Sequence, residues 1–198
     1  MAQEVCVYCG RRKPNRFCSV LGKLLCSQCC GRNRRKLIDC SEDCRFLLEG
    51  RRQALKRLVK LSGDRSFELK FFSVLHDFRL TLLNFLEIHK GTISDSEVVT
   101  AIEHTAETLR VRSRGLIFDF RSTNPRVQQA TDLLFEIAEW YHNNGNGTEG
   151  STIGFEELSA SLRYLEKQIL SATNRGIDFW NLVKETVGIR LLAKISKK

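Results

Sequence analysis

The chain has 198 residues, of which 42% are hydrophobic and 28% charged, and its formal net charge is +9 at pH 7. This composition is typical of a globular protein and excludes a disordered or fibrous chain. No apolar run reaches the roughly 18 residues that a membrane span requires, so we expect no membrane partner. The start of the chain, MAQEVCVYCG, lacks the basic region and apolar core of a secretion signal, which favours a cytoplasmic protein.

All eight cysteines lie within the first 44 residues, and the other 154 residues contain none. We therefore divide the chain into a cysteine-rich zinc-binding module, residues 1–44, and an α-helical domain, residues 45–198. In a reducing compartment such a cluster favours metal ligation, and a secreted disulfide module is the alternative.

Charge is also distributed unevenly along the chain. The first 60 residues carry 15 Lys and Arg residues against 5 Asp and Glu residues, whereas the rest carries 17 against 18. Two zinc sites with four thiolates each would lower the N-terminal excess of positive charge by about 4. The N-terminal part therefore stays basic after metal binding.

Hydrophobic periodicity predicts helices for most of the domain. The expected helices span residues 41–61, 66–89, 94–111, 125–143, 154–173 and 177–195. Ser41 is the expected N-cap of the first helix, which is shared between module and domain, and Asn124–Pro125 marks the start of the fourth. Residues 114–125 alternate poorly and are expected to be extended or irregular, and residues 143–152 form a loop rich in glycine and asparagine. The predicted fold class is all-α: a small cysteine-rich zinc-finger module fused to a bundle of about six helices.

Two CxxC pairs stand at a spacing that is typical of zinc sites. Cys6 and Cys9 form the first pair, and Cys26 and Cys29 follow after 16 intervening residues. Backbone N–H groups in such a turn can point at the sulfur atoms, and Gly10 allows the positive φ that the turn requires. We expect these four cysteines to hold one zinc ion.

The other four cysteines, Cys18, Cys30, Cys40 and Cys44, are then available for a second zinc ion. Since the adjacent side chains of Cys29 and Cys30 diverge, the two sites would interleave. Two alternatives stay open: Cys29 and Cys30 can exchange roles, and Cys18 can be a spare buried thiol. An iron–sulfur cluster is the competing metal group, but the cysteine spacings of ferredoxins are absent. Sites made of cysteine alone are closed and usually structural, which argues against a catalytic zinc ion.

The order CxxC, CxxC and then Cys40-Ser-Glu-Asp-Cys44 resembles the interleaved two-zinc fingers of the MYND and HIT type. The resemblance covers about 45 residues and implies a cross-braced zinc fold. It departs from the pattern at one point, because those fingers usually end with a histidine and a further cysteine, whereas the first histidine here is His76. The resemblance leaves open whether the partner is a protein or a nucleic acid.

Three groups of cations are candidates for binding phosphate groups. They are Arg11, Arg12, Lys13 and Arg16; Arg32, Arg34, Arg35 and Lys36; and Arg51, Arg52 and Lys56. Tyr8 and Phe17 can stack on unpaired bases, which favours RNA over duplex DNA. A merely solvated surface, or one that docks to an acidic protein, is the alternative.

The sequence contains no glycine-rich phosphate loop, GxSxG or HExxH motif. We therefore expect a non-enzymatic zinc-finger protein that binds RNA or a ribonucleoprotein through its basic N-terminal surface. The helical domain would then be available to a protein partner. The alternative function is a protein–protein adaptor in which the zinc finger and the helical domain are docking surfaces.

Overall fold

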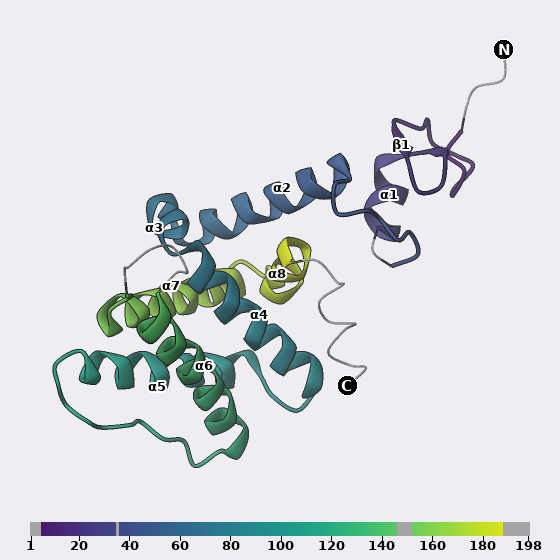
Figure 1. Cartoon of the computed structure of the whole chain (residues 1–198). Helices are drawn as coiled ribbons and strands as arrows, with labels where there is room; N and C mark the ends of the chain where they lie inside the picture. The colour runs from purple at the N-terminus through teal and green to yellow at the C-terminus, as the bar shows by residue number, and fades with distance from the viewer. Residues whose placement is uncertain (1–4, 35, 146–151, 188–198) are drawn as a thin grey trace. The chain divides into compact units, whose positions relative to one another are not determined.

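The computed structural model describes residues 5–34, 36–145 and 152–187. The elements in chain order are β1 (Arg16–Cys18), β2 (Lys23–Leu25), α1 (Ser27–Asn33), α2 (Arg45–Ser62), α3 (Arg65–Lys70), α4 (Phe72–Ile88), α5 (Asp95–Arg112), α6 (Pro125–Asn144), α7 (Phe155–Asn174) and α8 (Phe179–Val187) (Figure 1). The predicted fold class is confirmed: the protein is mainly α-helical and has a cysteine-rich N-terminal region. Across the described ranges, no helix is long and apolar enough to cross a lipid bilayer.

The chain divides into two compact units. The described residues up to Gln53 form the N-terminal unit, and Ala54–Val187 forms the helical unit, so the boundary lies inside α2. Each unit has its own buried core, as expected for parts that fold around separate sets of side chains.

The N-terminal unit contains a small antiparallel sheet that the sequence did not predict. β1 and β2 pair so that Phe17 lies opposite Leu24, and Gly22 in the connecting turn has a φ of +61°, which glycine adopts without strain. Beyond the sheet, the core of this unit is built largely from cysteines. Its buried members are Cys6, Leu25, Cys26, Cys30, Ile38, Cys40 and Leu47.

The first long helix begins later than expected. α2 starts at Arg45, whereas the sequence predicted a start at Ser41. The N–H of Cys44 donates to the carbonyl of Ser41 at 3.1 Å, so residues 41–44 form a separate turn before the helix. The prediction of a helix over 41–61 is therefore wrong at its N-terminus, because this turn takes the place of the first helical residues.

The second expected helix is divided in two. α3 ends before Phe71, whose backbone adopts φ −108° and ψ 26°, and α4 follows directly. Phe71 is buried, and its ring lies 4.7 Å from that of Phe67. The apolar spacing continues on both sides of Phe71, so the periodicity alone does not reveal the break.

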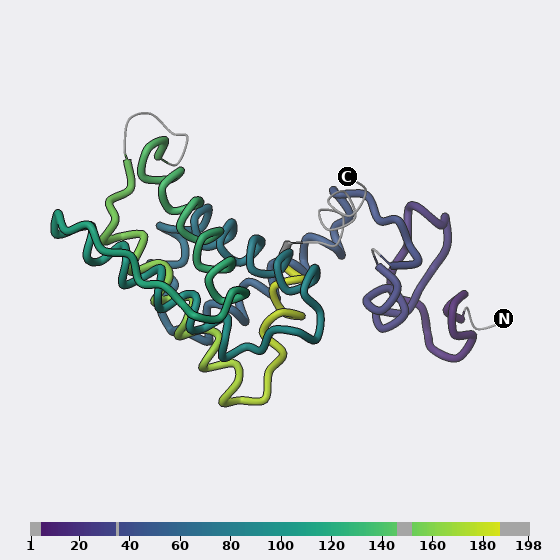
Figure 2. Tube along the Cα trace, turned by 90° about the horizontal axis from the view of Figure 1, so that it is seen from below, coloured from purple at the N-terminus to yellow at the C-terminus, as the bar shows by residue number. Residues whose placement is uncertain are grey.

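The helical unit is organised around α5, which packs mainly on α7 and α6. Ser94 caps α5 in a capping box with Glu97. Asn124 caps α6 with Pro125 in the first turn, as the sequence indicated. The α5–α6 connection is extended without forming a strand, in agreement with the expectation for residues 114–125. Figures 1 and 2 show the turn at the start of this connection at the outer edge of the helical unit.

The expected C-terminal elements are only partly covered by the described residues. α7 agrees with the predicted helix over 154–173, and α8 covers the first part of the helix predicted over 177–195. Residues 188–195 of that helix, and residues 146–151 of the predicted glycine-rich loop, lie outside the described ranges.

A buried polar network joins four helices of the helical unit, α2, α3, α4 and α7. The guanidinium of Arg79 on α4 donates to both carboxylate oxygens of Glu68 on α3, at 2.7 and 3.0 Å, and to Gln168 on α7 at 2.5 Å. Gln168 in turn donates to the carbonyl of Leu58. All three side chains of the network are buried, so the network fixes the register of these helices.

Candidate metal centre and basic surface

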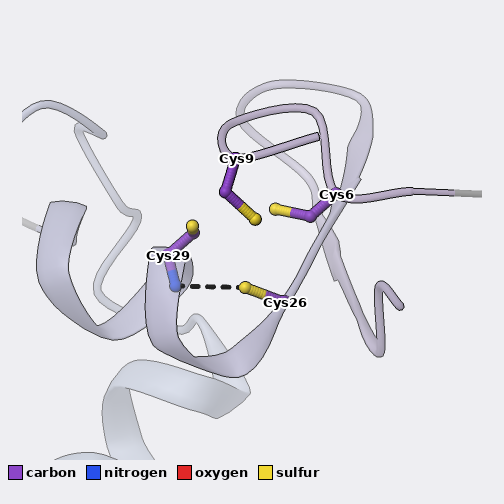
Figure 3. A group of neighbouring side chains, drawn as sticks. All are labelled: Cys6, Cys9, Cys26 and Cys29. Carbon is purple, nitrogen blue, oxygen red and sulfur yellow. Dashed lines mark hydrogen bonds between the residues drawn. The ribbon is translucent and has the colours of Figure 1, made fainter. Parts of the chain in front are cut away.

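Four cysteine side chains converge in the N-terminal unit. The sulfur atoms of Cys6, Cys9, Cys26 and Cys29 all lie within 4.8 Å of one another, and all four are thiols without a disulfide. In Figure 3 the first two come from a loop, while the other two come from the start of α1. The four residues that the sequence predicted for the first metal site thus form one group that could hold a metal ion.

The first CxxC pair lies in a closed loop. The N–H of Cys6 donates to the carbonyl of Arg12 at 2.9 Å, and the N–H of Gly10 donates to the carbonyl of Cys6 at 2.7 Å. Gly10 has a φ of +58°, as the sequence predicted for a CxxCG turn. A side chain at this position would strain the backbone, and the glycine therefore lets the chain fold back around both sulfur atoms.

The second CxxC pair opens α1. Cys26 is the N-cap of this helix, and its Sγ accepts a hydrogen bond from the N–H of Cys29 at 3.4 Å (Figure 3). One side chain therefore caps the helix and also faces the other three sulfur atoms. A thiolate is the better acceptor at a helix N-terminus, because the helix dipole favours negative charge there.

Backbone N–H groups stabilise negative charge in this group. Burial opposes ionisation of Cys6, but N–H groups of Cys26, Cys9 and Tyr8 lower the pKa of its thiol from 9.0 to about 6. N–H groups of Arg11 and Arg12 lower the pKa of Cys9 as well. By contrast, the neighbouring Cys26 thiol and burial raise the pKa of Cys29 to about 12. A bound cation would favour the thiolate form of its ligands.

The donor set fits a tetrahedral thiophilic ion. With zinc–sulfur bonds of about 2.3 Å, the sulfur atoms of a tetrahedral site lie about 3.8 Å apart, and the observed separations, all within 4.8 Å, are compatible with that spacing. Four thiolates would complete the coordination of the ion and leave no position for water. The chemistry of such a site is structural: it cross-links the loop at Cys6 to the start of α1.

The second predicted set does not bring its sulfur atoms as close together as the first. Among the described residues, the first set is the only group of three or more candidate metal ligands whose ligand atoms all lie within 4.8 Å of one another. Cys30 and Cys40 are nevertheless buried in the same core, and Cys18 and Cys44 pack against it. A second ion at these four residues would therefore require their sulfur atoms to move closer together.

Several of the predicted phosphate-binding cations make contacts inside the N-terminal unit instead. Arg34 donates to the carbonyl of Phe46 at 3.2 Å, and Arg16 lies over the Phe46 ring at 4.8 Å. Arg51 pairs with Glu42 at 3.1 Å, and Arg52 with Glu49 at 3.3 Å. These four arginines stabilise the unit around α2, so they are less available to a ligand than the sequence suggested.

The other predicted cations are exposed. Arg11, Arg12, Lys13, Arg32 and Lys36 belong to the N-terminal unit, and within the described part of the chain none of them forms an ion pair. Lys56 is also exposed but belongs to the helical unit, and Arg35 lies outside the described residues. The backbone of Arg11 and Arg12 hydrogen-bonds to the Cys9 sulfur, and Arg32 lies on α1 with Cys29. Arg11, Arg12 and Arg32 are thus carried by the same loop and helix that position the sulfur atoms.

No protein-family model, curated protein or solved structure matches this chain.

Proposed function

We propose that the N-terminal unit is a structural zinc finger that binds nucleic acid, with single-stranded RNA preferred over duplex DNA. The observation that carries the proposal is the placement of Arg11, Arg12 and Arg32 on the loop and helix that hold the four-thiol group. Zinc would make both elements rigid, so these cations would lose little conformational entropy on meeting a phosphate backbone.

Exposed aromatic side chains support single-stranded RNA as the ligand. Tyr8 lies in the Cys6–Cys9 loop and is 41% exposed, and Phe17 on β1 is 57% exposed. In the sequence, Tyr8 lies three residues before Arg11, and Phe17 lies four residues after Lys13. Unpaired bases can stack on such rings while neighbouring cations contact the phosphates, whereas bases inside a duplex are not accessible for stacking.

A second zinc ion, held by Cys18, Cys30, Cys40 and Cys44, belongs to the same proposal, together with the cross-braced arrangement that the MYND and HIT resemblance implies. The support is that all four residues belong to or pack against one core. Elemental analysis of the purified protein tests it: two zinc ions per chain are expected, Cys9→Ser and Cys40→Ser each reduce the content to one, and a content of one in the unsubstituted protein contradicts the second site.

The nucleic-acid part is tested by titrating zinc-loaded protein with single-stranded RNA at several salt concentrations. The triple variant Arg11→Ala, Arg12→Ala, Arg32→Ala is expected to bind more weakly and to lower the slope of log K against log salt by about 0.7 for each lost contact. Arg52→Ala is the matched control, because Arg52 is exposed in the same unit but paired with Glu49. The proposal fails if the zinc-loaded protein binds no RNA at low salt, or if the control variant loses as much affinity as the triple variant.

A protein-docking role is the second candidate function. It is favoured by an apolar row on the small sheet, where Phe17 lies opposite Leu24 and the N–H of Val7 donates to the Leu24 carbonyl at 3.4 Å. Phe17 and Val7 are both exposed. Docking through this row would depend weakly on salt and would be abolished by Phe17→Asp, whereas phosphate binding falls steeply as salt rises. A non-enzymatic role for the whole chain is part of both proposals.

A further inference from the structure

The α5–α6 connection exposes three consecutive large apolar side chains. Leu116 is 60%, Ile117 93% and Phe118 57% exposed, although the chain continues into well-packed helices on either side. In an extended segment that lies flat on a protein, successive side chains alternate between the body and the solvent. Exposure of all three shows that their side chains do not pack into the helical unit. The turn that precedes them lies at the outer edge of that unit in Figures 1 and 2.

The base of the segment is held in place. Gly115, with a φ of +76°, donates its N–H to the carbonyl of Arg112, and the N–H of Phe120 donates to Oγ1 of Thr108 at 3.0 Å. Arg112 bridges Asp119 and Glu139 at 2.9 and 3.0 Å. Because the two ends of the segment are fixed to α5 and α6, presenting the apolar tip to a ligand would require little further ordering.

The charge around the tip is positive. Asp119 is the only acidic residue of the segment 113–124, and Arg112 neutralises it. Arg114 and Arg121 flank the apolar tip, both are exposed, and neither has an ion pair within the described ranges. An apolar tip between two uncompensated cations is complementary to a surface with anionic groups above an apolar layer.

We propose that the segment Leu116–Phe118 inserts into the interface of an anionic lipid bilayer, with Arg114 and Arg121 at the level of the headgroups. The absence of a long apolar run in the sequence predicts no membrane partner, but insertion into the interface of a bilayer needs no such run. The exposure of these residues, which carries the proposal, is visible only in the folded unit.

Two other kinds of partner fit the segment less well. A stable protein–protein interface buries roughly 800 Å² on each side, which three exposed side chains do not supply, and this applies to a second copy of the chain as well. Nucleic acid would contact the arginines and Phe118, but Leu116 and Ile117 have no ring to stack on a base. A bilayer accepts apolar side chains on every side of the segment.

The deciding measurement is insertion, because the exposed cations of the N-terminal unit would also attract anionic vesicles. Phe118→Trp places an indole at the tip, and Ile88→Trp is the matched control at a residue of the same unit that is 70% exposed. The vesicles contain phosphatidylcholine and phosphatidylserine with brominated acyl chains, which quench an indole that enters the bilayer. Trp140 and Trp180 give the background signal. We expect the fluorescence added by Phe118→Trp to be quenched and the fluorescence added by Ile88→Trp not to be. Equal quenching in the two variants, or none in either, overturns the proposal.

Binding of the zinc-loaded 198-residue chain to the same vesicles gives a second readout. Ile117→Asp is expected to weaken vesicle binding roughly tenfold or more, and Ile88→Asp to leave it unchanged. Arg114→Ala with Arg121→Ala is expected to weaken it roughly fivefold per arginine. Unchanged thermal unfolding of these variants shows that they are folded. If Ile117→Asp instead dissociates a dimer in sedimentation, or weakens RNA binding while vesicle binding is kept, the segment serves another partner and the proposal is wrong.

Discussion

The guanidinium of Arg34 packs against α2 at Gly50. Arg34 follows α1, its N–H caps that helix at the carbonyl of Cys30, and its side chain donates to the carbonyl of Phe46 on α2. A Cβ at position 50 would lie 2.8 Å from Cζ of Arg34 and closer still to Nη1. The glycine therefore makes room for the arginine, and the pair joins the helix that carries Cys26 and Cys29 to α2.

Gly50→Ala should not give the stabilisation that this change usually gives inside a helix. Replacing a helical glycine by alanine normally stabilises by about 1 kcal/mol. Here the new methyl group displaces Arg34, so the gain is offset by the lost contact with Phe46. In an Arg34→Ala background the conflict is absent, and Gly50→Ala should then stabilise by about 1 kcal/mol. The measurement is hydrogen exchange of the α1 and α2 amides in the unsubstituted protein, the two single variants and the double variant. If the effects of the two substitutions on stability simply add, Gly50 and Arg34 are not coupled and the prediction is wrong.

Removal of the proposed zinc ion should affect the two units differently. The core of the N-terminal unit consists largely of cysteines, whereas the core of the helical unit contains none. A chelator is therefore expected to abolish amide protection in residues 5–34 and 36–44 while leaving α4 to α7 protected and most of the helical circular dichroism intact. Adding zinc back should restore the protection. Equal protection of the N-terminal unit with and without metal would contradict a structural role for the ion.

Local signals in the sequence were sufficient for much of this fold. The Ser94 capping box, the Asn124–Pro125 start of α6 and the CxxCG turn each depend on residues within a few positions of one another. At Phe71, by contrast, the apolar spacing continues across the break, so the periodicity does not report it.

The cysteine pairs were also predictable from local sequence, whereas the contacts of the individual cations were not. Cys6, Cys9, Cys26 and Cys29 were identifiable as one group from their spacing, because two CxxC pairs at this distance are typical of metal sites. The sequence grouped Arg32 with Arg34 as one basic run. Arg32 is exposed on α1, however, whereas Arg34 turns toward α2 because position 50 has no side chain. Only the tertiary structure separates a cation that contacts its own protein from one that a ligand can reach.

Breaking the buried pair of Arg79 and Glu68 should be strongly destabilising. Arg79→Met leaves the carboxylate of Glu68 buried without its main partner, and the expected loss is about 3–5 kcal/mol in the free energy of unfolding. Lys70→Met is the matched control, since it removes the exposed pair of Lys70 and Glu157 and is expected to cost less than about 1 kcal/mol. Urea unfolding of both variants measures the contrast, and equal losses would show that burial of the Arg79 pair is unimportant.

Glu107 should contribute to the stability of the helical unit only above acidic pH. Arg110 donates to its carboxylate at 2.7 Å and Arg163 at 2.6 Å, and chiefly the Arg110 hydrogen bond holds its pKa below the usual value of 4.5 despite burial. A lowered folded-state pKa stabilises the fold above the unfolded value, and the contribution is lost as the pH falls through the folded value. Glu107→Gln is therefore expected to cost up to about 1 kcal/mol at pH 7 and progressively less as the solution is acidified below the usual value. Urea unfolding across this pH range measures it, with Glu136→Gln on the exposed side of α6 as the control. A loss for Glu107→Gln that is independent of pH would mean that the carboxylate acts through packing and not through its charge.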